Sequence, residues 1–301
     1  MTQVMQRWMA VLCVIVLWAV AAAPQAAPSS PQRAVDELLA ADRGFSAASA
    51  KTTVVPGLSA MFAPGVIMPL PGGEFATGAG TVVKALAANP ANTTGRVEWT
   101  PIRGGISADG AQGFTFGFMT LHNADGTTAP LKYMTYWVKS ADGWRAVAYK
   151  RARRPEGPVS LALMPPSLPM KMVAPVAITG AVRQELVAAE QAFSDEAQKI
   201  GLGPAFAQFG LPDAVNFGGG ANANYVVGAT AIAALVGAGQ HATGSPVSWR
   251  CDTAIVASSG DLGVSIGLIH PNAPRPDGTT TPTPFFTIWR KVNGAWKYIA
   301  E

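Results

Sequence analysis

Residues 38–46 read Leu-Leu-Ala-Ala-Asp-Arg-Gly-Phe-Ser, and residues 186–194 read Leu-Val-Ala-Ala-Glu-Gln-Ala-Phe-Ser, 148 positions further along the chain. Apolar residues recur in both stretches at spacings of three and four, which favours an amphipathic helix. An acid and a serine stand at the same places in each. The chain is therefore expected to contain two copies of one helix, and of whatever packs against it.

The repeat extends through the rest of both halves. Three pairs of tryptophan, a rare residue, match in order with offsets that drift from 150 to 152. The pairs are Trp99 with Trp249, Trp137 with Trp289, and Trp144 with Trp296. Small loop insertions account for the drift, and 301 residues are enough for two domains of about 100 to 150 residues each. The chain is a duplication.

Prolines between the two copies mark a boundary, because they interrupt regular elements and favour an extended linker. The expected organisation is a signal peptide at 1–27, copy one at 33–154, a proline-rich linker at 155–179 and copy two at 180–301. The basic run from Lys150 to Arg154 is interpreted as a solvated strand end that enters this linker.

The N-terminus has the pattern of an export signal. Arg7 precedes an apolar stretch, Trp8–Ala23, and small residues follow it. The pattern predicts a periplasmic or secreted protein with no stable membrane anchor after cleavage. A lipid anchor at Cys13 and an uncleaved anchor are the alternatives.

Cys251 is the only cysteine left after cleavage, which excludes an internal disulfide. We expect it to be buried and inert rather than reactive.

The order of elements within each copy predicts an α+β layout, with helices first and an antiparallel sheet after them. Beyond the first helix, short helices are expected at 80–88 and 229–236. Alternation at 114–118 and 262–268 predicts half-buried strands. The last two strands are expected at 134–138, 144–148, 285–289 and 296–299. Asp-Gly pairs at Asp125 and Asp277 indicate hairpin loops.

Several short motifs resemble one family. They are the stretch quoted first, a glycine before the second helix (Gly78 and Gly228), Gly-Asp-Leu-Gly at Gly260, and Trp-Arg-Lys-x-x-x-x-Trp-Lys from Trp289. Together they look like the nuclear transport factor 2-like superfamily, with the ketosteroid isomerase-like, SnoaL-like proteins nearest. The resemblance covers nearly all of both copies.

The resemblance implies two tandem cone-shaped domains, each a curved antiparallel sheet packed on N-terminal helices around an apolar pocket. Such domains pair through their sheets, so the two copies are expected to pair with each other or with a second chain. Members include isomerases, dehydratases, epoxide hydrolases, binding modules and assembly proteins, so the fold alone does not assign a function. No cofactor is expected.

Three acids are candidates for catalysis. Asp42 and Glu190 lie on the apolar faces of their helices, where a raised pKa would suit a general acid or base. A structural role, accepting hydrogen bonds from a tryptophan, a tyrosine or a loop, is favoured over this for both. Asp213 stands where the family pattern often has an acid, but copy one has Gly65 there.

Two histidines and five aromatic residues complete the candidates. His122 and His270 lie near strand ends and are interpreted as surface or turn residues, since no acid partner can be placed beside either. Aromatic candidates for lining an apolar ligand pocket, with sheet packing as the alternative, are Trp99, Tyr136, Trp137, Trp249 and Trp289.

Other chemistries find no support in the sequence. The net charge is +4 with scattered basic residues, which argues against nucleic-acid binding. Histidine and cysteine show no zinc-ligand spacing, so no metal is expected, and no Gly-x-Ser-x-Gly elbow is present.

The favoured function is an exported module that binds a small apolar ligand or supports protein association. The alternative is a cofactor-independent lyase, isomerase or hydrolase with an inward carboxylate as the base.

Overall fold

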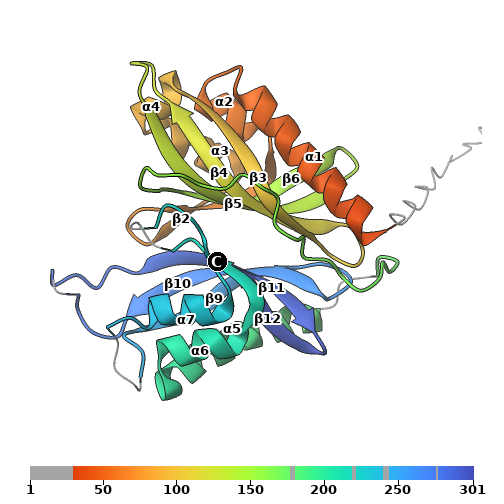
Figure 1. Ribbon diagram of the computed structural model, residues 1–301, viewed down its shortest axis with the longest axis vertical. Helices are drawn as coiled ribbons and strands as arrows, with labels where there is room; N and C mark the ends of the chain where they lie inside the picture. Colours follow the sequence, from red (N-terminus) through yellow and green to blue (C-terminus); the bar gives the residue numbers. More distant parts are fainter. Residues whose placement is uncertain (1–29, 177–179, 219–221, 240–243, 276) are drawn as a thin grey trace, which may run out of the picture.

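The computed structural model describes residues 30–176, 180–218, 222–239, 244–275 and 277–301. The expected signal peptide and Cys13 lie outside the described residues. Within them the protein repeats one order of elements, in which helices are followed by a sheet (Figure 1).

The elements of the first copy are α1 (Pro31–Ser49), α2 (Val54–Ser59), β1 (Phe62–Leu70), β2 (Glu74–Thr77), α3 (Ala79–Ala87), α4 (Pro90–Thr94), β3 (Arg96–Ile106), β4 (Gln112–His122), β5 (Thr128–Ser140) and β6 (Gly143–Arg153). Those of the second copy are α5 (Gly180–Ile200), α6 (Leu202–Phe209), β7 (Gly210–Asn216), β8 (Val226–Val227), α7 (Ala229–Val236), β9 (Val247–Val256), β10 (Leu262–Pro271), β11 (Thr283–Val292) and β12 (Ala295–Ala300). Every helix and strand expected from the sequence is present, and the α+β class is confirmed.

Each sheet has six strands in equivalent orders, β2-β1-β6-β5-β4-β3 and β8-β7-β12-β11-β10-β9. The expectation of purely antiparallel sheets is wrong in one respect. β1 runs parallel to β6, and β7 runs parallel to β12, with an irregular register in both pairs. The first strand of each copy returns beside its last strand, and that makes each sheet mixed.

α1 shows why the quoted stretch forms a helix. Ser30 caps its N-terminus by accepting a hydrogen bond from the main-chain N–H of Arg33, and Pro31 occupies a position where a missing N–H costs nothing. Val35 and Leu38 are buried on one face, against β3. The Asp-Gly loops also form as expected, because Gly126 and Gly278 adopt the positive φ that such turns require.

The two sheets lie face to face, with the helices of each copy on the outer sides (Figure 1). One apolar cluster, defined by residues such as Phe114, Phe116, Val264, Phe286 and Ile288, joins the inner faces of both sheets. The pairing of the two copies is thus internal to the chain. It resembles an oligomer interface in burying a sheet face that a single domain would leave in water.

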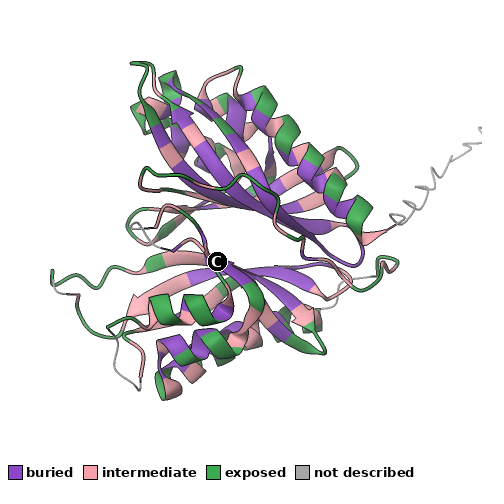
Figure 2. Ribbon diagram, in the orientation of Figure 1, coloured by how far each residue is buried: buried purple, intermediate pink, exposed green. Residues whose placement is uncertain are grey.

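This packing corrects the expectation of half-buried strands. Residues 112–119 of β4 are all buried, and β10 is buried from 262 to 267 (Figure 2). One face of each strand packs under its own helices, and the other packs against the opposite sheet. The residues that alternate with the large apolar ones along β4 and β10 are therefore core residues too.

The linker lies along the first copy. Between Arg154 and Val176 it contains no helix and one isolated bridge, in which Ser167 pairs with Gly105. The main-chain N–H of Met164 donates to Ile102, and that of Val173 donates to Ala108. Proline prevents regular strand pairing here, so the linker attaches to β3 at separated points.

Charged residues connect the two copies at the sheet edges. Arg103 of β3 is only 1% exposed, and its guanidinium donates to the carboxylate of Asp213 and to the main-chain oxygen of the same residue, at 2.6 Å for the latter. In the hairpins, the Asp109 carboxylate accepts from the main-chain N–H of Ser259, while the Asp261 carboxylate accepts from that of Ala108. Asp213 is therefore an inter-copy contact residue.

We expect Asp213→Ala to lower the free energy of unfolding by about 1–3 kcal/mol, because Arg103 loses a charge-assisted hydrogen bond while buried. Urea denaturation measures the change. The matched control is Asp252→Ala, which breaks the exposed pair with Arg250 and should cost at most about 0.5 kcal/mol. Equal losses in the two variants would show that the buried contact is not special.

Candidate functional site: a pocket in the second copy

The acid of the repeated stretch is buried in the core of each copy. Asp42 in α1 and Glu190 in α5 are 0% and 1% exposed. Each accepts a hydrogen bond of 2.6 Å from an indole N–H on the facing strand, Trp99 for Asp42 and Trp249 for Glu190. In both copies the serine of the repeated stretch also accepts the main-chain N–H of that tryptophan. In each copy, the repeated stretch thus holds a strand tryptophan by two hydrogen bonds, one to its acid and one to its serine.

Both carboxyl groups accept further hydrogen bonds. The Tyr133 hydroxyl donates to Asp42 at 2.7 Å, while Ser265 and Trp289 donate to Glu190. Burial raises the pKa of both acids, and these hydrogen bonds oppose the shift only in part. The two carboxyls act as acceptors that hold the strand side chains in place.

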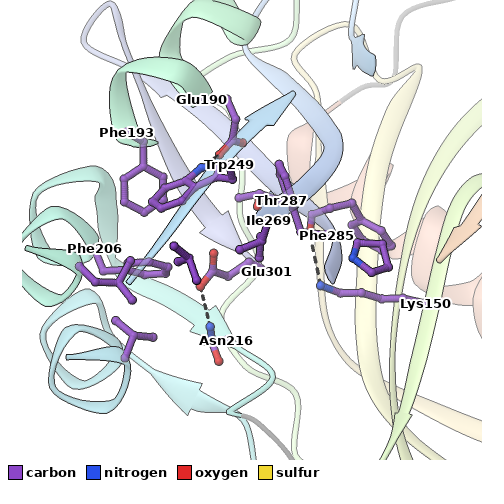
Figure 3. Close-up of a pocket in the computed structure, with 15 residues that line it drawn as sticks. Lys150, Glu190, Phe193, Phe206, Asn216, Trp249, Ile269, Phe285, Thr287 and Glu301 are labelled. Atoms are coloured by element: carbon purple, nitrogen blue, oxygen red, sulfur yellow. Dashed lines mark hydrogen bonds between the residues drawn. The ribbon is translucent and has the colours of Figure 1, made fainter. Parts of the chain in front are cut away.

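A pocket of about 320 Å³ opens in the second copy, between its helices and the concave face of its sheet (Figure 3). Most of its wall is apolar or aromatic. The lining includes Phe193, Leu202, Phe206, Val236, Trp249, Ile269 and Phe285. A mainly apolar cavity with a few polar groups is the usual form of a small-molecule site.

Three of the polar side chains that line this pocket, Lys150, Asn216 and Glu301, form what is called here its polar end. Asn216 of β7 donates its amide N–H to Oε1 of Glu301 at 2.5 Å. Lys150 of β6 enters from the first copy and donates to the main-chain oxygen of Phe286 at 3.2 Å (Figure 3). The Lys150 ammonium also lies 4.5 Å from the centre of the Phe286 ring. The pocket is therefore completed by a residue of the other copy.

The pKa values of Glu301 and Lys150 are both shifted in the direction that favours the neutral form. Burial raises the pKa of Glu301 to about 7, although the Asn216 amide and the Lys150 charge pull it down, and the nearby Glu190 pushes it up. Burial lowers the pKa of Lys150 to about 8, against the opposing charge of Glu301. Near neutral pH both groups can exchange a proton.

Glu301→Gln should therefore change how stability depends on pH. The folded-state pKa of Glu301 lies above the unfolded value, so its stabilising contribution is complete below about pH 4.5 and is lost as the pH rises towards 7. Relative to wild type, the variant should gain on the order of 1–2 kcal/mol between pH 5 and 7, measured by urea unfolding at pH 5, 6 and 7. Glu156→Gln, at an exposed acid, is the control. Parallel pH profiles for wild type and Glu301→Gln would contradict the expectation.

The first copy fills the equivalent positions with larger or apolar side chains. The strand registers align Tyr149 with Glu301 and Met68 with Asn216. Tyr149 and Met68 are buried in the core of the first copy, where the Tyr149 hydroxyl contacts the sulfur of Met119. The polar end of the pocket is therefore a feature of the second copy only.

The aromatic candidates divide between the two faces of the sheets. Trp249 lines the pocket, Trp99 and Trp289 bind the buried acids, and Trp137 donates to Thr115 at 2.8 Å. Tyr136 lies instead in the cluster between the sheets, where its hydroxyl donates to Gln112. Tyr136 thus faces away from the concave side.

The histidines lie away from the pocket's polar end. The expectation that no acid stands beside them is wrong for His122, because its Nε2 lies 3.1 Å from Oε1 of Glu98 on the neighbouring strand. Both side chains of that pair are exposed. His270 is half-buried beside Gln198 and Arg250 in a shallow surface depression.

Cys251 is half-buried, packed at the edge of the second core, and burial raises the pKa of its thiol to about 11. A thiol whose pKa is raised in this way is a poor nucleophile at neutral pH.

Among the described residues, no cluster of three or more His, Cys, Asp or Glu side chains is arranged to hold a metal ion. None of the helices in the described part of the chain is long and apolar enough to cross a membrane.

Sequence reasoning missed the polar residues of the pocket, Lys150, Asn216 and Glu301. Lys150 was interpreted as solvated, but the opposite sheet covers it. A usable signal existed in the repeat itself, because Asn216 and Glu301 replace Met68 and Tyr149 at matched positions. When polar residues replace core residues in only one copy of a repeat, the core of that copy is expected to contain a polar site.

No family model matches the sequence, and no curated protein matches it. Among solved structures, the chain is similar to a candidate dehydratase of the NTF2-like family from Streptomyces avermitilis, with 17% identity over 41% of this chain and 97% of that one, at a TM-score of 0.33. It is also similar to a ketosteroid isomerase-like protein from Erwinia carotovora atroseptica, with 18% identity over 41% of this chain and 92% of that one, at a TM-score of 0.27.

A third match is a candidate calcium/calmodulin-dependent protein kinase II association domain from Xanthomonas campestris, with 16% identity over 48% of this chain and 100% of that one, at a TM-score of 0.31. The first two of these matching structures are NTF2-like and ketosteroid isomerase-like proteins, the group that the repeated motifs resemble. Each of the three corresponds in length to about one copy.

Proposed function

We propose that the second copy binds a small, mainly apolar molecule that carries one polar group, and that the first copy serves as its partner and scaffold. The observation that carries the proposal is the pocket of about 320 Å³, with aromatic walls and three polar side chains at one end. That volume lies at the lower limit of typical ligand sites, so a compact ligand fits better than a long lipid.

The division of roles follows from the matched positions. The first copy places Tyr149 and Met68 where the second has Glu301 and Asn216, and it contributes Lys150 to the pocket of the second. One copy supplies the binding space, and the other supplies a charge and a sheet to pack against. The apolar stretch Trp8–Ala23 supports placing this activity in the periplasm or outside the cell.

Proton-transfer catalysis without a cofactor is a second candidate function, and one observation favours it. Glu301 lies in an apolar pocket with a pKa near 7, which is suited to a general acid or base at neutral pH. Asp42 does not line this pocket, and the carboxyl oxygens of Glu190 are occupied by three donors. Glu301 is therefore the carboxylate that we assign to the base in this case.

Two measurements test the binding proposal. Native and denaturing mass spectrometry of the protein purified from a bacterial periplasm should reveal a retained mass that is lost on denaturation. Titration with the neutral apolar fluorophore N-phenyl-1-naphthylamine should give saturable binding and quench tryptophan fluorescence, because Trp249 lines the pocket. Absence of both a retained mass and saturable fluorophore binding would refute the proposal.

A further inference from the structure

The polar end of the pocket contains an ammonium and a carboxyl group that do not touch. Lys150 and Glu301 both line the pocket, one from each copy, and Figure 3 shows the Glu301 carboxyl group turned towards Asn216, with Lys150 entering from the other side. Among the ion pairs formed by the described residues, with nitrogen and oxygen within 4.0 Å, this pair is absent. Both side chains line the same pocket, so a polar group of a bound ligand can contact both.

Each of the two side chains has hydrogen-bonding capacity left. The Lys150 ammonium carries three protons and directs one to the main-chain oxygen of Phe286. Glu301 accepts from Asn216 through Oε1, which leaves Oε2 for another partner. A bridging group must therefore accept from Lys150 and also bond to Oε2 of Glu301.

We infer that this end of the pocket recognises a carboxylic acid, bound together with one proton. One ligand oxygen accepts from the Lys150 ammonium, and the other shares a proton with Oε2 of Glu301. The two oxygens of a planar carboxylate reach two separated partners, whereas the single oxygen of an alcohol reaches them less well. This inference rests on the proposed binding function and specifies its ligand class.

Charge balance supports the same ligand class. The charged or titratable groups near Glu301 are Lys150 from β6, Glu190 from α5 and the Tyr298 hydroxyl from β12, with the neutral amide of Asn216 from β7. A bound carboxylate plus a protonated Glu301 leaves one negative charge against the Lys150 ammonium, so the charges of these three groups balance. A bound amine would leave a net positive charge, which is costly in such a pocket.

Competition experiments with one chain length test the inference. Octanoate, octanol and octylamine displace bound N-phenyl-1-naphthylamine from the full-length purified protein, and calorimetry in two buffers of different ionisation enthalpy counts the protons exchanged. We expect octanoate to bind most tightly, by on the order of tenfold over octanol. Its binding should take up protons, and more at pH 8 than at pH 6, because the wild-type Glu301 is less protonated at pH 8.

Variants separate the two partners of the ligand. Lys150→Met should reduce the octanoate-to-octanol preference to about one, whereas Arg153→Met, at an exposed position on the same strand, should leave it unchanged. Glu301→Gln keeps a donor for the ligand oxygen, so octanoate should still be preferred, but with no proton uptake at pH 6 and less than wild type at pH 8, where Lys150 still takes up protons. Thermal unfolding confirms that each variant folds.

Two results would overturn the inference while the binding proposal stands. They are octanol or octylamine binding as tightly as octanoate, and octanoate binding with no proton uptake, in a protein that still binds the fluorophore. If neither the fluorophore nor any of the three ligands bound, the proposed function itself would fall with the inference.

Discussion

Replacing Asp42 with leucine is expected to lower the free energy of unfolding by about 2–5 kcal/mol. The substitution leaves the indole N–H of Trp99 and the hydroxyl of Tyr133 buried without their acceptor. Each orphaned donor costs roughly 1–3 kcal/mol, and loss of the buried carboxyl, whose pKa is raised by burial, returns part of that cost. Urea unfolding followed by fluorescence measures the difference.

Milder changes refine this prediction. Asp42→Asn keeps one acceptor oxygen but turns an amide N–H₂ towards a donor, so a loss of about 1–2 kcal/mol is expected. Asp36→Asn, at an exposed acid of the same helix, should change stability by less than about 0.5 kcal/mol. Because Asp42 lies in the first copy, Asp42→Asn should bind the fluorophore as wild type does. Loss of binding by a folded Asp42→Asn protein would show that the fluorophore binds in the first copy and not in the pocket of the second.

The second large effect, on ligand affinity, is expected when two pocket residues are replaced by the residues at the matched positions of the first copy. The double variant Asn216→Met and Glu301→Tyr installs the residues that stand at the matched positions, and it should weaken fluorophore binding by about a hundredfold or more. The larger side chains occupy the space that the ligand would use. The pocket has room for them, and Met68 and Tyr149 pack in the core at the matched positions of the first copy. Fluorescence titration at fixed pH measures the affinity.

A control of the same kind is available outside the pocket. Val227 is exposed, and the residue at its matched position in the first copy is Thr77. Val227→Thr should therefore leave fluorophore binding unchanged. If the double variant folds with a normal melting temperature and still binds like wild type, the ligand lies elsewhere.

The sequence predicted the parts of the fold that depend on local pattern. Helical spacing identified α1 and α5, the Asp-Gly pairs identified the loops before β5 and β11, and matched tryptophans revealed the duplication. β1 was missed because Phe62–Leu70 contains two prolines and a glycine, which obscure any alternation. Its parallel pairing with β6 joins residues about 80 positions apart, and no local pattern encodes such a partner.

The candidate site was predictable only in part. Asp42 and Glu190 were found because their helical spacing places them inward, and the structure shows the tryptophan and tyrosine donors that hold them there. Lys150 was misjudged because its burial comes from the opposite sheet and not from its own strand. Burial that arises when two domains dock cannot be obtained from the periodicity of either domain.

Duplication within one chain also removes a constraint that applies to a pair of identical subunits. A twofold dimer must place every residue on both sides of its axis, so a charge that reaches the neighbouring pocket does so twice. Here Arg103 meets Asp213 in one direction only, since Gly65 stands at the position matched to Asp213. For the same reason, Lys150 of the first copy can line the pocket of the second without an equivalent contact in the other direction. The two halves can thus differ in role: core side chains fill the first at these positions, and the second keeps an internal space.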